Sequence, residues 1–244
     1  YVFHLPVAGN AQRGTWRLDL LSDPKAPPLA SQRVLVEDFL PERIDFDIAL
    51  PEGPLEAGGV VPVGVDARYL FGAPGADLKV SGWVQVRQLD TLEAWPGYRF
   101  GRHDKSVYPA GDTFPYGIST DEAGHAGIEV PLPVLDEATG PMQASFTVQV
   151  AEGSGRPVER RETRPVAPAG PVIGIGPKFD GGEVPEGSRA GFRLIALDTD
   201  LTPMPMKVKW TVNRVRNDWR WYLSYGNWNW EPLVTRTKVA EGEA

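Results

Sequence analysis

Proline and glycine interrupt this chain so often that it has no room for long helices. The 244 residues include 27 Gly and 24 Pro, and either residue costs free energy in the interior of a helix. Between the interruptions, apolar and polar residues alternate in short runs. Such alternation has the period of a half-buried β-strand. The sequence therefore predicts an all-β fold.

The two strand-like runs on either side of Pro41 mark a junction. Val34 and Val36 share one face of the run before it, and apolar residues alternate with polar ones over residues 44–50 after it. Proline has no N–H for a strand ladder, and it biases Leu40 toward extended geometry. One strand cannot run through unbroken, so we expect the chain to change sheets here. A domain boundary is predicted between residues 40 and 41.

Further alternating runs predict the remaining strands. We expect them over residues 14–20, 61–71, 79–87, 128–134, 145–150, 190–197 and 207–215. The aromatic, irregular segment 93–114 suits a long excursion from the fold better than a strand, and residues 120–127 are expected to form a turn. About seven short strands separated by turns are typical of an immunoglobulin-like β-sandwich.

A charged stretch at 153–165, followed by a proline cluster at 164–171, predicts a second boundary. The predicted division is then 1–40, 41–165 and 166–244. The first and last parts are too short for a sandwich of about 100 residues. We therefore expect one complete sandwich flanked by the last strands of one domain and the first strands of another, as in a piece excised from a longer polypeptide.

Composition argues against several classes of partner. The chain carries 25 basic and 32 acidic residues, for a net charge of −7, and no Lys/Arg-rich run marks a phosphate-binding stripe. Nucleic acid and anionic membranes are not expected partners. The six residues at the start have no signal-peptide pattern, and no apolar run approaches the roughly 18 residues of a membrane span.

Metal sites are not expected. With no cysteine in the sequence, disulfides and thiolate ligands are excluded. The three histidines fall in separate regions and are expected on the surface: His4, His103 and His125. Residues 198–200 resemble the start of a calcium loop, but Pro203 and Lys209 stand where such a loop needs Gly and Glu. A turn is predicted there instead.

The catalytic and cofactor-binding motifs considered are also incomplete. The glycines at 174–176 lack the third glycine and the following helix of a dinucleotide site. Residues 153–155 lack the frame of a nucleophile elbow, and no pair of carboxylates lies in an apolar setting that would tune one as an acid. The sequence predicts neither an enzyme nor a cofactor, and a hydrolase is the weakest alternative.

An aromatic run near the end of the chain is the candidate functional site. Five of the eight Trp lie between Trp210 and Trp230, in a stretch that interrupts the strand pattern. The candidate interface or binding residues are Trp219, Trp221, Tyr222, Tyr225, Trp228 and Trp230. Exposed coplanar rings in a groove would favour a carbohydrate-binding or adhesin-like module, and rings buried against a neighbouring domain would favour structural packing. Packing or an interface is the favoured interpretation.

Three segments, in the right order along the chain, resemble the bacterial alpha-2-macroglobulin family. Residues 14–16 with 34–41 are similar to the end of one macroglobulin-like domain and the start of the next. Residues 67–74 with 80–82 are similar to a motif early in that next domain. Residues 155–158 and 165–166 with the Arg and Trp/Tyr stretch 215–222 are similar to the following boundary and the domain beyond it.

The resemblance implies tandem immunoglobulin-like macroglobulin domains that form a scaffold around a bait region. A protease that cuts the bait is trapped by a conformational change, often with covalent capture by an internal thioester. The thioester needs a Cys-Gly-Glu-Gln motif, and this sequence has no cysteine. The resemblance therefore implies non-catalytic scaffold domains of a protease inhibitor, with bait and thioester elsewhere.

The same resemblance implies where such a protein acts. Its partners would be target proteases, through the full-length protein, and neighbouring macroglobulin domains. It would be periplasmic, with a role in defence of the bacterial host. A lipid anchor to the inner membrane would lie outside these residues.

Overall fold

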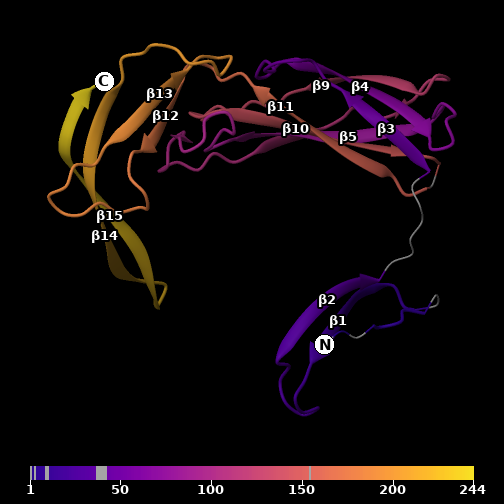
Figure 1. Ribbon diagram of the computed structural model, residues 1–244, viewed down its shortest axis with the longest axis horizontal. Coiled ribbons are helices and arrows are strands. Elements are labelled where there is room, and N and C mark those ends of the chain that lie inside the picture. The colour runs from indigo at the N-terminus through magenta and orange to yellow at the C-terminus, as the bar shows by residue number, and fades with distance from the viewer. Residues whose placement is uncertain (1, 3, 9–10, 37–42, 154) are drawn as a thin grey trace.

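The computed structural model describes residues 2, 4–8, 11–36, 43–153 and 155–244. Every regular element in these ranges is a β-strand, and none of the described residues is helical, so the predicted all-β fold is confirmed. The first two strands, β1 (Gly14–Leu20) and β2 (Ala30–Val36), form an antiparallel hairpin, which Figure 1 shows apart from the other strands. The predicted junction at Pro41 lies outside the described residues, as does Ser154.

Two antiparallel sheets form a β-sandwich in the middle of the chain (Figure 1). One sheet has the strand order β3-β4-β9, and the other has the order β11-β10-β5-β7 with β8 also beside β5. Their bounds are β3 Ile44–Ala49, β4 Val60–Tyr69, β5 Lys79–Gln88, β7 Ala110–Thr113, β8 Ile118–Ser119, β9 His125–Pro131, β10 Met142–Ala151 and β11 Val158–Val166. This is the predicted sandwich.

The core of the sandwich lies between its two sheets. Phe46, Val63 and Val130 reach it from the three-stranded sheet, and Val84 lies opposite Phe146 in the pairing of β5 with β10. Both members of that pair are fully buried. Each such side chain contributes about 1.5–3 kcal/mol by leaving water. As strands, the alternating runs place their apolar residues on one face of each sheet, where this core buries them.

A second, smaller sheet follows the sandwich. It consists of β12 (Val172–Pro177), β13 (Phe192–Leu197) and the two-residue strand β6 (Arg99–Phe100), in the order β13-β12-β6. Strand β6 belongs to the loop between β5 and β7 of the sandwich. The sandwich therefore supplies one strand to the sheet of the next unit.

The chain ends in a long antiparallel hairpin of β14 (Lys209–Ser224) and β15 (Asn227–Glu243). Its turn consists of Tyr225 and Gly226, whose φ angles are 48° and 78°. Positive φ at both central residues is the requirement of the tight two-residue turn that matches the twist of a hairpin. Glycine meets this requirement without steric cost.

Two loops differ from the sequence-based expectations. Residues 93–114 were expected to be an excursion without a strand, but they contain both β6 and β7, and β7 pairs with β5 at the edge of the sandwich. The predicted turn at 120–127 is shorter, because β9 begins at His125. Strands β6 and β7 were missed because such short edge strands carry little apolar alternation. Strand β9 was predicted, but it begins three residues before its first large apolar residue, Ile128.

The charged stretch expected to mark the second boundary is largely a strand. Strand β11 pairs with β10 from Val158↔Val150 to Val166↔Met142. Val158 and Val166 are buried, while most residues between them are exposed or half-buried. An edge strand can expose charged residues in this way, and the charges discourage pairing with other chains. The division into 1–40, 41–165 and 166–244 stays a prediction.

Candidate functional site

The hairpin of β14 and β15, called the aromatic hairpin below, has one apolar and one polar face near its turn. Trp221 pairs with Trp230 and Leu223 with Trp228. Residues paired across an antiparallel ladder have side chains on the same face, and so do residues two positions apart. The apolar face near the turn therefore consists of Trp219, Trp221, Leu223, Trp228, Trp230 and Pro232.

The rings of the apolar face are exposed. Trp221 is 64% exposed and Trp228 70%. The rings of Trp219 and Trp230 pack edge to face, with centroids 4.6 Å apart and planes at 79°. Edge-to-face packing is a favourable arrangement for two aromatic rings, but it does not give the flat, coplanar surface on which a sugar stacks. None of the described residues covers the apolar face.

The opposite face of the aromatic hairpin carries ion pairs. Arg220 lies 2.9 Å from the carboxylate of its cross-strand partner Glu231, and Arg216 lies 3.0 Å from Asp218. Exposed pairs of this kind are worth little stability each, but they make this face compatible with water. The polarity of the two faces indicates that only the apolar one is suited to contact with another surface.

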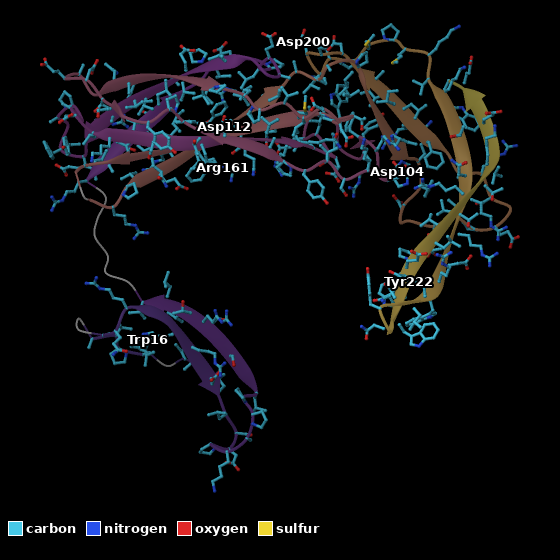
Figure 2. All side chains as sticks on the ribbon, turned by 180° about the vertical axis from the view of Figure 1, so that it is seen from behind. Trp16, Asp104, Asp112, Arg161, Asp200 and Tyr222 are labelled. Carbon is cyan, nitrogen blue, oxygen red and sulfur yellow. The ribbon has the colours of Figure 1, made fainter. Side chains whose placement is uncertain are left out.

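The structure brings four of the six predicted aromatic residues together. Trp219, Trp221, Trp228 and Trp230 share the apolar face, whereas Tyr222 belongs to the polar face and Tyr225 lies in the turn. Figure 2 shows Tyr222 near the end of the hairpin, away from the sandwich. Whether these six residues bind a partner stays a prediction.

The expectation that the aromatic run interrupts the strand was wrong. Strand β14 continues through it to Ser224. The missed signal was the alternation of Trp219, Trp221 and Leu223 with Arg220 and Tyr222. With that alternation, Leu223 would have been recognised as part of the same apolar face.

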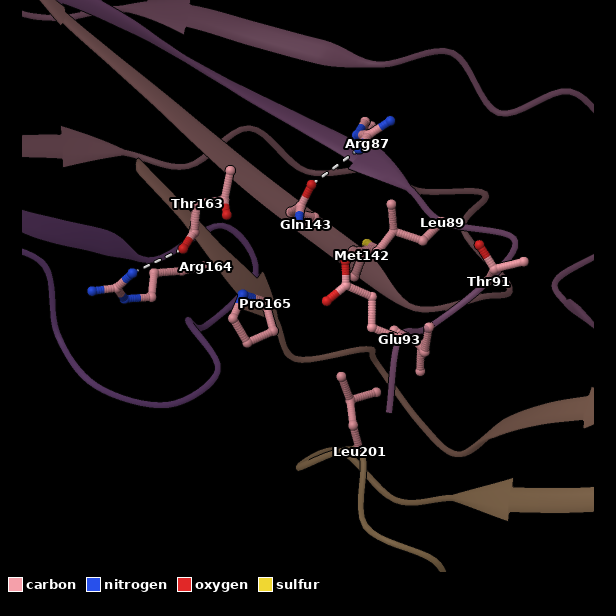
Figure 3. A pocket seen from close by; sticks show the side chains of 11 residues that line it. Arg87, Leu89, Thr91, Glu93, Met142, Gln143, Thr163, Arg164, Pro165 and Leu201 are labelled. Atoms are coloured by element: carbon pink, nitrogen blue, oxygen red, sulfur yellow. Dashed lines mark hydrogen bonds between the residues drawn. The ribbon is translucent and has the colours of Figure 1, made fainter. Parts of the chain in front are cut away.

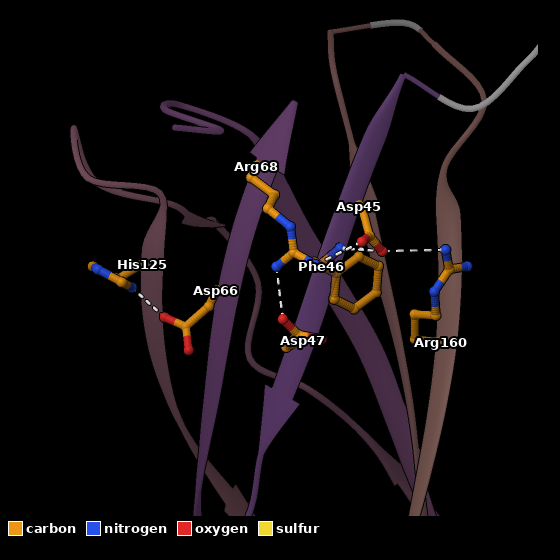
Figure 4. Close-up of polar contacts among 7 residues, drawn as sticks. All are labelled: Asp45, Phe46, Asp47, Asp66, Arg68, His125 and Arg160. Carbon is orange, nitrogen blue, oxygen red and sulfur yellow. Dashed lines mark hydrogen bonds and ion pairs between the residues drawn. The ribbon is translucent and has the colours of Figure 1, made fainter. Parts of the chain in front are cut away.

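An ion-pair network joins the two sheets of the sandwich at one end (Figure 4). Arg68 donates hydrogen bonds to Asp47 at 2.6 Å and to Asp45 at 2.7 Å. Arg160 on β11 lies 3.4 Å from Asp45 and over the ring of Phe46, at 5.9 Å from its centroid. The hydrogen bond and the charge of Asp47, with the charge of Asp45, raise the pKa of Arg68. A guanidinium keeps its charge near neutral pH, so this network is structural.

The histidines lie far apart in the fold. His125 contacts Asp66, its cross-strand partner between β9 and β4 (Figure 4), while His103 lies in the loop after β6 and His4 precedes β1. In the ranges that the structure describes, no three His, Cys, Asp or Glu side chains gather as metal ligands would. Nor do those ranges contain a helix long and apolar enough to cross a bilayer.

Residues 198–200 form the predicted turn. The Asp198 carboxylate accepts the backbone N–H of Thr202 at 2.9 Å and that of Asp200 at 3.0 Å. These bonds, the one from Thr202 above all, hold the pKa of Asp198 below its usual value. The carboxylate is therefore used to close the loop.

A cavity of about 590 Å³ lies where the sandwich meets the loop after β13 (Figure 3). Of the residues that line it, Glu93 is the only carboxylate. Arg87 donates to the side chain of Gln143 at 3.1 Å, and Arg164 donates to the carbonyl of Pro51 at 3.1 Å. A single carboxylate beside two hydrogen-bonded arginines offers no acid–base pair.

The fold places this chain in a general class: a segment of tandem immunoglobulin-like β-sandwich domains, with an exposed aromatic face and no identifiable reaction centre among the described residues. Comparison with known families agrees. Residues 42–168 match the family model for the bacterial alpha-2-macroglobulin MG5 domain, and residues 174–244 match that for bacterial macroglobulin domain 6. The chain belongs to the bacterial alpha-2-macroglobulin family, which confirms the resemblance found in the sequence.

Whole relatives are much longer than this chain. An alpha-2-macroglobulin of Xylella fastidiosa is 30% identical over 236 residues, which cover 94% of this chain and 14% of the relative. The native conformation of E. coli alpha-2-macroglobulin has a TM-score of 0.72 at 25% identity, over 99% of this chain and 16% of that one. E. coli alpha-2-macroglobulin activated by porcine elastase has a TM-score of 0.58 at 25% identity, over 98% of this chain and 22% of that one.

Proposed function

We propose that this chain is a non-catalytic scaffold segment of a longer bacterial alpha-2-macroglobulin that traps proteases after they cut a bait region. The match of two consecutive macroglobulin domains, 42–168 and 174–244, carries the proposal. In this proposal the bait lies elsewhere in the parent protein. So does the thioester, because it needs a cysteine and these residues contain none. The role of the segment is to position those regions and to transmit their movement.

The two E. coli structures support a role in movement. Identity to this chain is 25% for both, and coverage of this chain is 99% and 98%, yet the TM-scores are 0.72 for the native conformation and 0.58 for the elastase-activated protein. Since identity is the same and coverage of this chain nearly so, we attribute the difference in TM-score to a different arrangement of the parts of the segment. A scaffold that changes its arrangement can pass on the consequence of bait cleavage.

The apolar face of the aromatic hairpin is, in this proposal, a contact surface for a neighbouring domain of the parent. Exposed apolar surfaces of this kind mark interaction sites. The alternative, carbohydrate binding, draws support from the exposure of Trp221 and Trp228, but the rings of Trp219 and Trp230 stand at 79° to each other. By family resemblance we place the parent in the periplasm, anchored by lipid to the inner membrane through a region outside this segment.

The test compares the parent protein with this segment alone. Each is incubated with trypsin at equal molar amounts, and complexes are counted by denaturing electrophoresis and by the activity that remains toward a large substrate. We expect the parent to retain trypsin and the segment to leave it free. Stoichiometric capture by the segment alone would overturn the proposal, as would a parent that is merely degraded. A titration of the segment with soluble glycans, followed by tryptophan fluorescence, tests the alternative.

A further inference from the structure

Residues 89–104, here called the strap, begin and end on the sandwich. At one end, the N–H of Leu89 donates to the carbonyl of Pro141 at 2.7 Å. At the other end, the N–H of Arg102 donates to the hydroxyl of Thr139 at 3.1 Å. Both ends are therefore held by one loop of the sandwich, which precedes β10.

The middle of the strap belongs to the next unit. Its strand β6 pairs with β12, with Arg99 opposite Ile175 and Phe100 opposite Gly174. Phe100 is only 3% exposed, and it is buried with Val172. The shared apolar cluster consists of Phe100, Val172 and Leu197, with Leu92, Trp95, Tyr98, Ile195 and Leu201 packed against them. Residues from both units thus form one core.

Two glycines of β12 make room for the strap. A Cβ on Gly174 would stand 2.7 Å from the Phe100 ring, and a Cβ on Gly176 would stand 2.5 Å from the carbonyl oxygen of Gly97. Neither β12 glycine has a positive φ, so space rather than backbone conformation requires glycine at both positions. This explains the glycines at 174–176, which are arranged to admit a strand and not a dinucleotide.

Charged groups add two further contacts across the junction. The guanidinium of Arg193 on β13 lies over the ring of Tyr98, 5.2 Å from its centroid. Asp104, at the end of the strap, lies 3.3 Å from Arg236 on β15. The strap therefore contacts the small sheet and the aromatic hairpin alike.

We propose that the strap locks the sandwich and the small sheet after it into one rigid body. Domains joined by a polar contact are expected to move relative to each other, whereas a hydrophobic interface opposes such motion. Here the sandwich also adds a strand to its neighbour's sheet, a mode of binding that fixes direction and register. The inference goes beyond the proposed function, because it holds whether or not the parent traps proteases.

Distance measurements between two spin labels test the lock. The chain has no cysteine, so the substitutions Glu129→Cys and Lys178→Cys create unique sites for labels. Both positions are exposed, one on β9 of the sandwich and the other just after β12. In the otherwise unchanged 244-residue chain we expect one narrow distance distribution.

Two variants remove the lock in different ways. Phe100→Ala deletes the ring that the strap inserts, and Gly176→Ala places a methyl group against the backbone of Gly97, which cannot yield as a flexible side chain would. Gly127→Ala is the matched control, because Gly127 also lies in a strand but a Cβ there would meet no atom within 4 Å.

We expect the distance distribution to broaden and shift in both variants and to stay unchanged in the control. If Phe100→Ala melts the small sheet, broadening in that variant reports unfolding of the sheet. Gly176→Ala, with its small sheet shown to be folded by circular dichroism, then decides between a lock and no lock. A distribution that stays narrow in both variants overturns the inference, and so does a broad distribution in the unchanged chain. Neither outcome depends on the trypsin experiment.

Discussion

The hydroxyl of Thr120 is a sensitive test of how this sandwich is held together. It accepts the backbone N–H of Leu78 at 2.9 Å and donates to the carbonyl of Gly75 at 2.5 Å. All three residues are buried. Thr120→Val keeps the shape of the side chain but removes both hydrogen bonds, whereas Thr120→Ser keeps the hydroxyl and removes only the methyl group.

We expect Thr120→Val to be less stable than Thr120→Ser. Apolar burial alone would predict the opposite order. Val leaves a buried N–H and a buried carbonyl without partners, at about 2 kcal/mol each, and its additional methyl group returns about 1 kcal/mol. The net loss is about 3 kcal/mol. Ser loses one buried methyl group, at about 1 kcal/mol. If apolar burial dominated, Val would instead be the more stable variant.

Calorimetry of the 244-residue chain and the two variants measures this order. For a sandwich of this size, a loss of about 3 kcal/mol lowers the midpoint of its transition by more than about 10 °C. We expect the order unchanged chain, Thr120→Ser, Thr120→Val, from most to least stable. The reasoning is refuted if the Val variant equals or exceeds the Ser variant.

Burial, charge and exposure at three other places lead to three more expectations. Phe146→Ala should lower the unfolding free energy measured in urea by about 3–5 kcal/mol, because Phe146 is fully buried. Phe71→Ala, at an 80% exposed position, should lower it by under about 1 kcal/mol. Equal losses would contradict the assigned core. The hydrogen bond from Arg102 and the nearby charges lower the pKa of Asp104 to about 2. The stability that Asp104 contributes is therefore present above about pH 4 and lost as the pH falls toward 2. In that window the urea midpoint should depend less on pH in Asp104→Asn than in the unchanged chain. The same pH dependence in both proteins would count against this prediction. Trp221→Thr should change the unfolding free energy of this chain by under about 1 kcal/mol, since the ring is 64% exposed. In the parent protein the same substitution should cost about 2–3 kcal/mol if a neighbouring domain covers the ring. Equally small effects in both proteins would argue against a covered face.

The elements found from the sequence are those whose one face is buried along its whole length. Strands β3, β4 and β5 alternate between core and more exposed positions, and each was predicted within a few residues. Strand β10 was also found, from the alternation of Phe146, Val148 and Val150 with polar residues, although both of its faces are largely buried. A half-buried strand must repeat every two residues. Local sequence is then sufficient to locate it, and many such runs together define an all-β fold.

The elements missed are those that exist because of a distant partner. Residues 110–113 have the sequence Ala-Gly-Asp-Thr, with no apolar alternation, and they form a strand because β5 offers an edge. The candidate site shows the same limit. Its aromatic residues were found from composition, but their common face depends on the register in which Trp221 pairs with Trp230 and Leu223 with Trp228.

Residue types and short-range patterns were sufficient to predict the fold class and to exclude cysteine chemistry, and the family was found from the resemblance of three segments. The tertiary structure alone decided that Phe100 of the sandwich is buried beside Gly174 of the next sheet, and which rings of the aromatic hairpin share a face. The physical reason is that pairing between segments far apart in the chain depends on which edges and cavities the folded neighbours present. The periodicity of a single strand does not predict which distant segment it pairs with.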